Sequence, residues 1–320
     1  MSSLTNFYNS KHNEDTPITQ LPGFGKNSWI KYRLNRSYTN PWPVSEMDVY
    51  LCPTEPAKII SVNQAAKNVA TDIAHNYKNL YVAMSGGIDS EFVAKTFLEL
   101  GIPFTPIIFK VEDLNELDIW WAFKWCRENK IEPVVVEASG DEWVQRLITI
   151  SRDFCGRFGA GNGTMSFLYD YVRNVNGKLI TGGGFPEYYP DENLSYMWTR
   201  YIDSKMNNKN GYLIHEPDII QAIMYPEMPF NFLSWTSEIV LSYVAARDMT
   251  KTSAENKSVI MNCHPRPKNM GVGDLFFRTH PVLKNWILIR RKIGTAEAEY
   301  IGSKEEIIQM LTTGIGHDKR

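Results

Sequence analysis

The feature that most constrains this chain is an apolar run that leads directly into a loop with two adjacent glycines. The run covers residues 80–84, and the loop with the residues that follow it, 85–90, reads SGGIDS. A bounded apolar run of this length is typical of a buried central strand, and the residues after the loop have helical periodicity. The pattern predicts a strand, a tight loop and a helix.

Strands and helices continue to alternate along the middle of the chain. We predict helices over 61–75, 89–100, 115–130, 141–154 and 164–173, and strands over 80–84, 104–111, 133–137 and 178–181, with a flexible glycine-containing segment over 156–163. Strands that alternate with helices imply an α/β fold with a parallel, doubly wound sheet.

The two ends of the chain differ from this middle part. Residues 1–60 are rich in Asn, Ser, Thr and Pro, which predicts short strands and loops. Beyond about residue 190 the alternation gives way to aromatic-rich segments, with helices predicted over 234–247 and 303–311. We therefore expect an N-terminal extension (1–60), a central domain (61–192) and a substrate-facing C-terminal region (193–320).

The loop at 85–90 has the composition of a phosphate-binding site. It is predicted to lie at the carboxyl edge of the sheet, where the next helix presents unpaired N–H groups and a partial positive charge. Its glycines let the backbone approach an anion, and its serine hydroxyls can donate hydrogen bonds. A carboxylate beside polyphosphate is repulsive without a cation, so Asp89 predicts Mg²⁺. A plain turn capped by Asp89 or Ser90 is the alternative.

Charge, cysteines and hydropathy exclude several classes of protein. The chain has neither a GxxxxGK[ST] nor a GxGxxG string, which disfavours kinase-like transfer and hydride chemistry. Its formal charge of −2 gives no general basic field for nucleic acid, and its four cysteines form no CxxC pair. The N-terminus lacks the apolar region of a signal peptide, and no stretch reaches membrane-spanning length. We expect a soluble, cytoplasmic protein with no membrane contact and a small-molecule substrate.

SGGIDS resembles the SGGxDS signature of the PP-loop ATP pyrophosphatase superfamily and matches it at every fixed position, over a region of about 61–192. The resemblance implies an adenine nucleotide α-hydrolase-like fold and an adenylation reaction. In such a reaction a substrate oxygen attacks the α-phosphorus of ATP, pyrophosphate leaves onto the loop, and a nucleophile displaces AMP. The residues implied to bind the nucleotide with its Mg²⁺ are Ser85, Gly86, Gly87, Ile88, Asp89 and Ser90.

A second segment, 181–187, reads TGGGFPE and is similar to a glycine-rich, acid-ended loop of asparagine-synthetase-like enzymes. The resemblance implies that Gly182 and Gly183 lie beside the nucleotide and that Glu187 is a second metal carboxylate. The acidic pair usual in that loop is replaced here by Phe-Pro-Glu. A flexible loop with solvated acids is the alternative. Adenine in these folds usually lies near the end of the second strand, so Phe109 is either an adenine contact or a core residue.

The segment 262–268, NCHPRPK, gathers further polar groups. Arg266 and Lys268 could neutralise charge on the reacting phosphorus or on the leaving pyrophosphate, or could be solvated charges of a surface loop. Cys263 and His264 form a weaker candidate pair, because adjacent side chains seldom face each other usefully.

Together these features predict an AMP-forming, ATP-dependent ligase. It would adenylate a carboxylate or amide oxygen for attack by a nitrogen nucleophile, like an asparagine synthetase without its glutaminase domain. Residue 2 is Ser rather than a leading cysteine, so nitrogen would come from ammonia, an amine or a separate subunit. A tRNA- or nucleobase-modifying PP-loop enzyme is a less favoured alternative, and a catalytically silent ATP-binding module is a third. The sequence does not indicate the substrate or the oligomeric state.

Overall fold

The structure is a computed structural model of the 320-residue chain. It describes residues 58–112, 115–143, 145–146, 160–183, 225, 227–229, 231–248 and 250–263, together with short strands at 19–20, 30–34, 47–51, 187–188, 198–203 and 212–215. The predicted helix over 303–311 lies outside the described residues.

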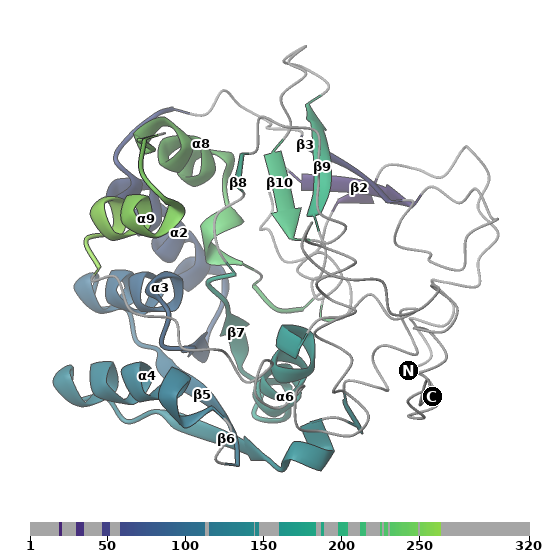
Figure 1. Cartoon of the computed structure of the whole chain (residues 1–320), viewed down its shortest axis with the longest axis vertical. Coiled ribbons are helices and arrows are strands. Elements are labelled where there is room, and N and C mark those ends of the chain that lie inside the picture. Colours follow the sequence, from purple (N-terminus) through teal and green to yellow (C-terminus); the bar gives the residue numbers. More distant parts are fainter. Residues whose placement is uncertain are drawn as a thin grey trace, which may run out of the picture.

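A four-stranded sheet with the order β6-β5-β4-β7 forms the centre of the molecule, and every neighbouring pair in it is parallel. Its strands are β4 (Leu80–Ala83), β5 (Thr105–Val111), β6 (Val134–Ala138) and β7 (Lys178–Ile180). Figure 1 shows helices on both sides of this sheet, with α6 opposite α3 and α4. The predicted α/β fold with a parallel, doubly wound sheet is therefore confirmed.

The helices that cover the sheet are α2 (Val62–Asn76), α3 (Ile88–Glu99), α4 (Glu116–Glu128) and α6 (Ala160–Asn174). Helix α2 shows why the pattern predicted a helix, since the six apolar residues at helical spacing are buried: Val62, Ala65, Ala66, Val69, Ala70 and Ile73. Burying a Val or Ile side chain contributes about 1.5–3 kcal/mol. The Ser61 hydroxyl caps the helix by accepting from the Gln64 N–H at 3.2 Å.

Helix α6 begins earlier than predicted, because it includes the end of the segment that we expected to be flexible. Gly161 and Gly163 lie in its first turn. A glycine costs about 1 kcal/mol in a helix interior, whereas the later turns bury Leu168, Tyr169 and Val172. Apolar burial therefore outweighs the glycine penalty. Of the helix predicted over 141–154, residues 141–143 and 145–146 are helical, and the remainder lies outside the described residues.

Residues 231–263 pack against α2 and α3 and complete the core. They form the short helix η2 (Phe232–Ser234), α8 (Ser237–Ala246) and α9 (Ser253–Met261). Helix α8 contacts α2, and α9 contacts both α2 and α3 (Figure 1). Their buried aromatic side chains belong to the same apolar cluster as the sheet. The helix predicted over 234–247 is confirmed, whereas α9 was not predicted.

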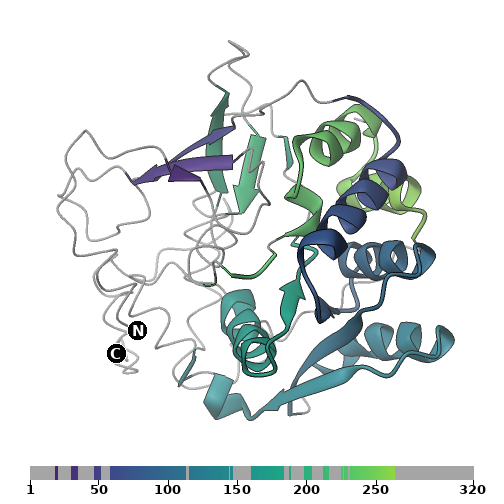
Figure 2. The ribbon, with the colours of Figure 1, turned by 180° about the vertical axis from the view of Figure 1, so that it is seen from behind.

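A second, six-stranded sheet joins the N-terminal strands to strands from the middle of the chain (Figure 2). Its order is β1-β2-β3-β9-β10-β8, with β3 and β9 parallel and the other pairs antiparallel. The strands are β1 (Thr19–Gln20), β2 (Ile30–Leu34), β3 (Met47–Leu51), β8 (Glu187–Tyr188), β9 (Trp198–Asp203) and β10 (Tyr212–His215). This sheet spans the predicted boundary near residue 192, and the division into three regions stays a prediction.

Candidate functional site

The predicted phosphate loop joins β4 to α3, at the carboxyl end of a central strand. Gly87 is the N-cap residue of α3, with a φ of −82°, and no side chain caps the helix. The side chains of Asp89 and Ser90 therefore do not form the plain capped turn that was the alternative. The first turn of α3 keeps N–H groups that no cap satisfies, and such groups are suited to an anion.

The two glycines of this loop have different physical roles. Gly86 has a φ of +78°, and a Cβ atom there would lie 2.2 Å from the Asp118 carbonyl oxygen in α4. Backbone conformation and packing both require glycine at that position. At Gly87 the φ is negative, and a Cβ would meet only the Ser85 Oγ, at 3.4 Å. The fold therefore does not require glycine at residue 87, and close approach of a ligand there stays a prediction.

The serine hydroxyls of this loop form hydrogen bonds with other residues of the same loop. The Ser85 and Ser90 Oγ atoms lie 3.3 Å apart, and the Gly87 N–H donates to the Ser85 Oγ at 3.3 Å. Ser90 is buried and donates its own hydroxyl to the Gly87 carbonyl oxygen at 3.0 Å. Ser85 is exposed, so of the two hydroxyls it is the one that a ligand can reach.

The second predicted glycine loop meets the first at Asp89. A Cβ on Gly182 would lie 3.0 Å from the carbonyl carbon and oxygen of Asp89, and 3.2 Å from the Ser90 nitrogen. The Gly183 N–H donates to the Asn231 Oδ1 at 3.2 Å, and this amide comes from the segment just before η2. The structure therefore brings the two glycine loops together, as parallel strands β4 and β7 require.

Asp89 has one carboxylate oxygen paired and one unpaired. Its Oδ2 lies 2.8 Å from the Lys257 Nζ on α9. Its Oδ1 is buried and has no hydrogen-bond partner among the described residues. Sequence reasoning missed Lys257, because the contact joins residues 168 positions apart. The Thr-x-x-Glu string at 252–255 could have indicated the start of α9, although not what that helix contacts.

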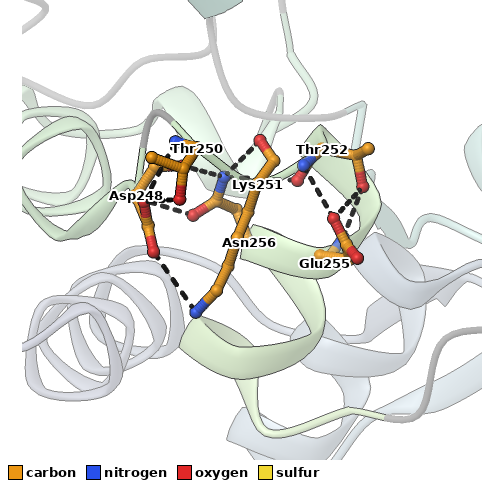
Figure 3. A network of polar contacts seen from close by, with 6 residues as sticks. All are labelled: Asp248, Thr250, Lys251, Thr252, Glu255 and Asn256. Carbon is orange, nitrogen blue, oxygen red and sulfur yellow. Dashed lines mark hydrogen bonds and ion pairs between the residues drawn. The ribbon is translucent and has the colours of Figure 1, made fainter.

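A compact polar network holds the start of α9 (Figure 3). The Thr252 hydroxyl accepts from the Glu255 N–H while the Glu255 carboxylate accepts from the Thr252 N–H, which forms a capping box. The Asn256 side chain is buried; its Oδ1 accepts from the Asp248 N–H at 2.8 Å, and its amide donates to the Asp248 carbonyl oxygen at 2.9 Å. These contacts fix the backbone that carries Lys257.

Phe109 is 4% exposed in β5 and stacks on Phe167 with ring centroids 5.1 Å apart. The structure therefore places Phe109 in the core, and a contact with adenine stays a prediction. Backbone polar groups at the end of β5 also have a protein partner, the side chain of Asn115. The Asn115 amide donates to the Phe109 carbonyl oxygen at 2.8 Å, and its Oδ1 accepts from the Val111 N–H at 2.9 Å.

Of the four candidate site residues predicted in the segment 262–268, the structure describes one. Cys263 is 5% exposed, and burial raises the pKa of its thiol to about 11. A thiol with this pKa is protonated near neutral pH, so it is a poor nucleophile. His264, Arg266 and Lys268 lie outside the described residues, and their proposed roles stay predictions.

Asp89 fits a nucleotide-bound Mg²⁺ better than a cage of protein ligands. Among the described residues no cluster of three or more His, Cys, Asp or Glu side chains could hold a metal. Mg²⁺ commonly binds one or two carboxylates together with substrate phosphates and water. The unpaired Oδ1 of Asp89 suits such a site. The backbone of Glu187 lies in β8 opposite Leu213, and its role as a second carboxylate stays a prediction.

Comparisons with solved structures give likenesses to two synthetases and a tRNA thiolase. No protein-family model matches the sequence, and no curated protein matches it. Among solved structures, an NH₃-dependent NAD synthetase from Campylobacter jejuni matches with 19% identity and a TM-score of 0.28, covering 38% of this chain and 56% of that one. NMN synthetase from Francisella tularensis matches with 15% identity and a TM-score of 0.32, covering 81% and 94%.

The U34-tRNA thiolase NcsA from Methanococcus maripaludis matches with 14% identity and a TM-score of 0.30, covering 76% of this chain and 84% of that one. None of these three proteins is an asparagine synthetase, so that narrower likeness stays a prediction. No described helix is both long enough and apolar enough to span a lipid bilayer.

Proposed function

We propose that this protein is a PP-loop ATP pyrophosphatase, which binds ATP with Mg²⁺ and transfers AMP to a substrate oxygen. The observation that carries the proposal is the convergence of two glycine loops on one acidic residue. The SGGIDS loop after β4 and the glycine loop after β7 meet at Asp89, where a Gly182 Cβ would lie 3.0 Å from the Asp89 backbone. This point is the carboxyl edge of a parallel sheet, where ligands of open α/β folds bind.

Several groups of the first loop would have distinct parts in binding the polyphosphate. The N–H groups in the first turn of α3 and the exposed hydroxyl of Ser85 would donate hydrogen bonds to phosphate oxygens. Gly87 would allow the backbone to approach those oxygens closely. Asp89 would hold Mg²⁺ through its unpaired Oδ1. When bound, Mg²⁺ supplies neutralisation of charge on the phosphate oxygens.

The reaction that we propose is the one implied by the resemblance of SGGIDS to the PP-loop signature. A substrate oxygen forms a bond to the α-phosphorus, the bond between the α-phosphorus and the bridging oxygen breaks, and pyrophosphate departs at the loop. Positioning and fixed hydrogen-bond donors suffice for most of the catalysis in such transfers. A nitrogen nucleophile then attacks the carbon that bears the adenylated oxygen, the bond between that carbon and oxygen breaks, and AMP leaves with the oxygen. Asparagine-synthetase-like ligation of a carboxylate or amide oxygen is the narrower form of this proposal.

Release of AMP is the direct test. The protein is incubated with α-labelled ATP, Mg²⁺ and separate pools of carboxylates with ammonia, carboxylates with amines, or tRNA. We expect AMP and pyrophosphate in equal amounts with one of the carboxylate pools. AMP only with tRNA would instead indicate a tRNA-modifying enzyme. ATP binding without AMP from any pool would contradict the proposal and identify a silent nucleotide-binding module.

A matched pair of variants isolates the role of Asp89. Asp89→Asn should abolish AMP formation that depends on Mg²⁺, because the amide has no charge with which to bind the metal. Glu116→Gln removes an acidic residue from the corresponding first turn of α4, where the side chain is exposed, and should leave the rate unchanged. Unchanged turnover in Asp89→Asn would exclude Asp89 as the metal ligand.

A further inference from the structure

Lys257 is a cation that the fold delivers to the phosphate loop from a distant part of the chain. Its Nζ lies 2.8 Å from the Asp89 Oδ2, and the two side chains are 15% and 23% exposed. The SGGIDS loop itself contains no basic residue. Among the described residues, Lys257 is the one cation that forms an ion pair with this loop.

Stabilisation alone is a weak explanation for this ion pair. Removing two charges from water costs much of what their attraction returns, so a partly buried pair contributes little net stability. Asp89 is in the first turn of α3, where the helix dipole already favours a carboxylate. Its Oδ1 is also left without a partner. The pair therefore resembles the charged part of a binding site more than a connection between helices.

The surroundings of Lys257 combine a fixed backbone with a mobile ammonium group. The residue follows Asn256, whose side chain ties the start of α9 to Asp248, beside the capping box of Thr252 and Glu255 (Figure 3). A lysine carries its charge on a flexible four-carbon stem. The ammonium can therefore move by several ångströms while α9 stays in place.

We propose that Lys257 is the cation of the phosphate site and exchanges partners when ligand binds. In the structure its ammonium pairs with Asp89 at 2.8 Å. Asp89 would hold Mg²⁺, whose charge would repel the ammonium of Lys257, and the ammonium would then pair with the pyrophosphate oxygens. The proposal rests on the proposed function, and the neutralising roles of Arg266 and Lys268 stay separate predictions.

Binding of pyrophosphate, measured by calorimetry with Mg²⁺ present, tests this exchange without any turnover. Lys257→Met should weaken binding by about tenfold or more, because a charge-assisted hydrogen bond is lost. Lys257→Arg should retain part of the affinity. The control is Lys251→Met. Lys251 belongs to the polar network at the start of α9, is 44% exposed and pairs with Asp248 at 3.4 Å. This control should bind pyrophosphate like the wild type.

Binding of Mn²⁺ alone, measured by water-proton relaxation, should change in the opposite direction. Lys257 competes with the metal for Asp89, so Lys257→Met should bind Mn²⁺ several-fold more tightly than the wild type. A residue that only connects α9 to α3 would not produce opposite changes for metal and pyrophosphate. Weaker Mn²⁺ binding by Lys257→Met would overturn the exchange.

The outcomes separate this inference from the proposed function. If the wild type binds neither ATP nor pyrophosphate, the proposed function fails. If the wild type binds pyrophosphate and a folded Lys257→Met variant binds it equally well, the inference fails and the function stands. Should Lys257→Met not fold, ¹³C-methylated lysines report on the wild type, and the NMR signal absent in Lys257→Arg is that of Lys257. Addition of pyrophosphate and Mg²⁺ should shift this signal, and an unchanged signal overturns the inference.

Discussion

The two glycine loops that meet at Asp89 are built in different ways. The loop after β4 is held by its own residues, since the Ser85 and Ser90 hydroxyls close it and Gly86 supplies the positive φ. The loop after β7 is held from outside. Its Gly183 N–H donates to the amide of Asn231, which is 48 residues further along the chain.

This difference determines how much each loop reveals in sequence. A loop whose residues hydrogen-bond to one another leaves a compact motif, which is why SGGIDS predicts both geometry and ligand. A loop held by a distant amide leaves only its glycines as a signal, and glycines alone are compatible with a flexible segment. We therefore expect the structure of the first loop to be disrupted by substitutions of its own residues. The structure of the second loop should be disrupted by substitutions elsewhere in the chain.

The largest expected effect is that of Gly86→Ala. The change forces alanine into a φ of +78° and places its Cβ 2.2 Å from the Asp118 carbonyl oxygen. Left-handed strain alone costs about 1–2 kcal/mol, and with the clash we expect a loss of at least about 3 kcal/mol in the free energy of unfolding by urea. Gly101→Ala is the control, because its φ is +64° with nothing within 4 Å of the Cβ. Gly101→Ala should lose only the free energy of left-handed strain. Equal losses of unfolding free energy in Gly86→Ala and Gly101→Ala would contradict a packing role for Gly86.

The second loop should respond to a change 48 residues away. Asn231→Ala removes the oxygen that accepts from the Gly183 and Leu233 N–H groups at 3.2 and 3.1 Å. Leaving such donors without a partner costs about 1–3 kcal/mol, so the free energy of unfolding should fall by roughly 2 kcal/mol. Pyrophosphate binding should weaken in addition. The exposed amide of Asn68 on α2 provides a control, and Asn68→Ala should change neither quantity measurably.

Two smaller changes distinguish packing from ligand contact. In Gly182→Ala the new Cβ would press on the Asp89 backbone at 3.0 Å, so the unfolding free energy should fall by about 1 kcal/mol and the loops should separate slightly. Gly87→Ala meets only an ordinary 3.4 Å contact and should leave stability nearly unchanged. If ligand uses this position, Gly87→Ala should nevertheless weaken pyrophosphate binding at least as much as Gly182→Ala does. Normal binding by Gly87→Ala would remove Gly87 from the site.

The same contrast explains what could be predicted from sequence. The strand, loop and helix from Leu80 to Glu99 were readable because apolar burial, glycine geometry and helix start all lie in consecutive residues. The parallel sheet followed from the alternation of elements. Helix α9 was missed because only two of its described side chains are buried, Asn256 and Met261, and its start is fixed by a polar network around Asn256. Lys257 was therefore invisible as a site residue, since nothing local connects it to Asp89.

The smallest effect concerns the thiol of Cys263, which lies just after the end of α9. The negative charge of Asp89 is among those that act on the pKa of this thiol. Burial is the main cause that raises the pKa of this thiol to about 11, so the folded protein favours the protonated form. The unfolded chain ionises the thiol first, and the resulting stability is full below about pH 8.5 and is lost as the pH rises toward 11. Between pH 8 and 10.5 the wild type should therefore lose on the order of 1 kcal/mol more than Cys263→Ala in urea unfolding. AMP formation at pH 7.5 should be the same in both proteins, and a large loss in Cys263→Ala would show that the first loop does use a nucleophile beside it.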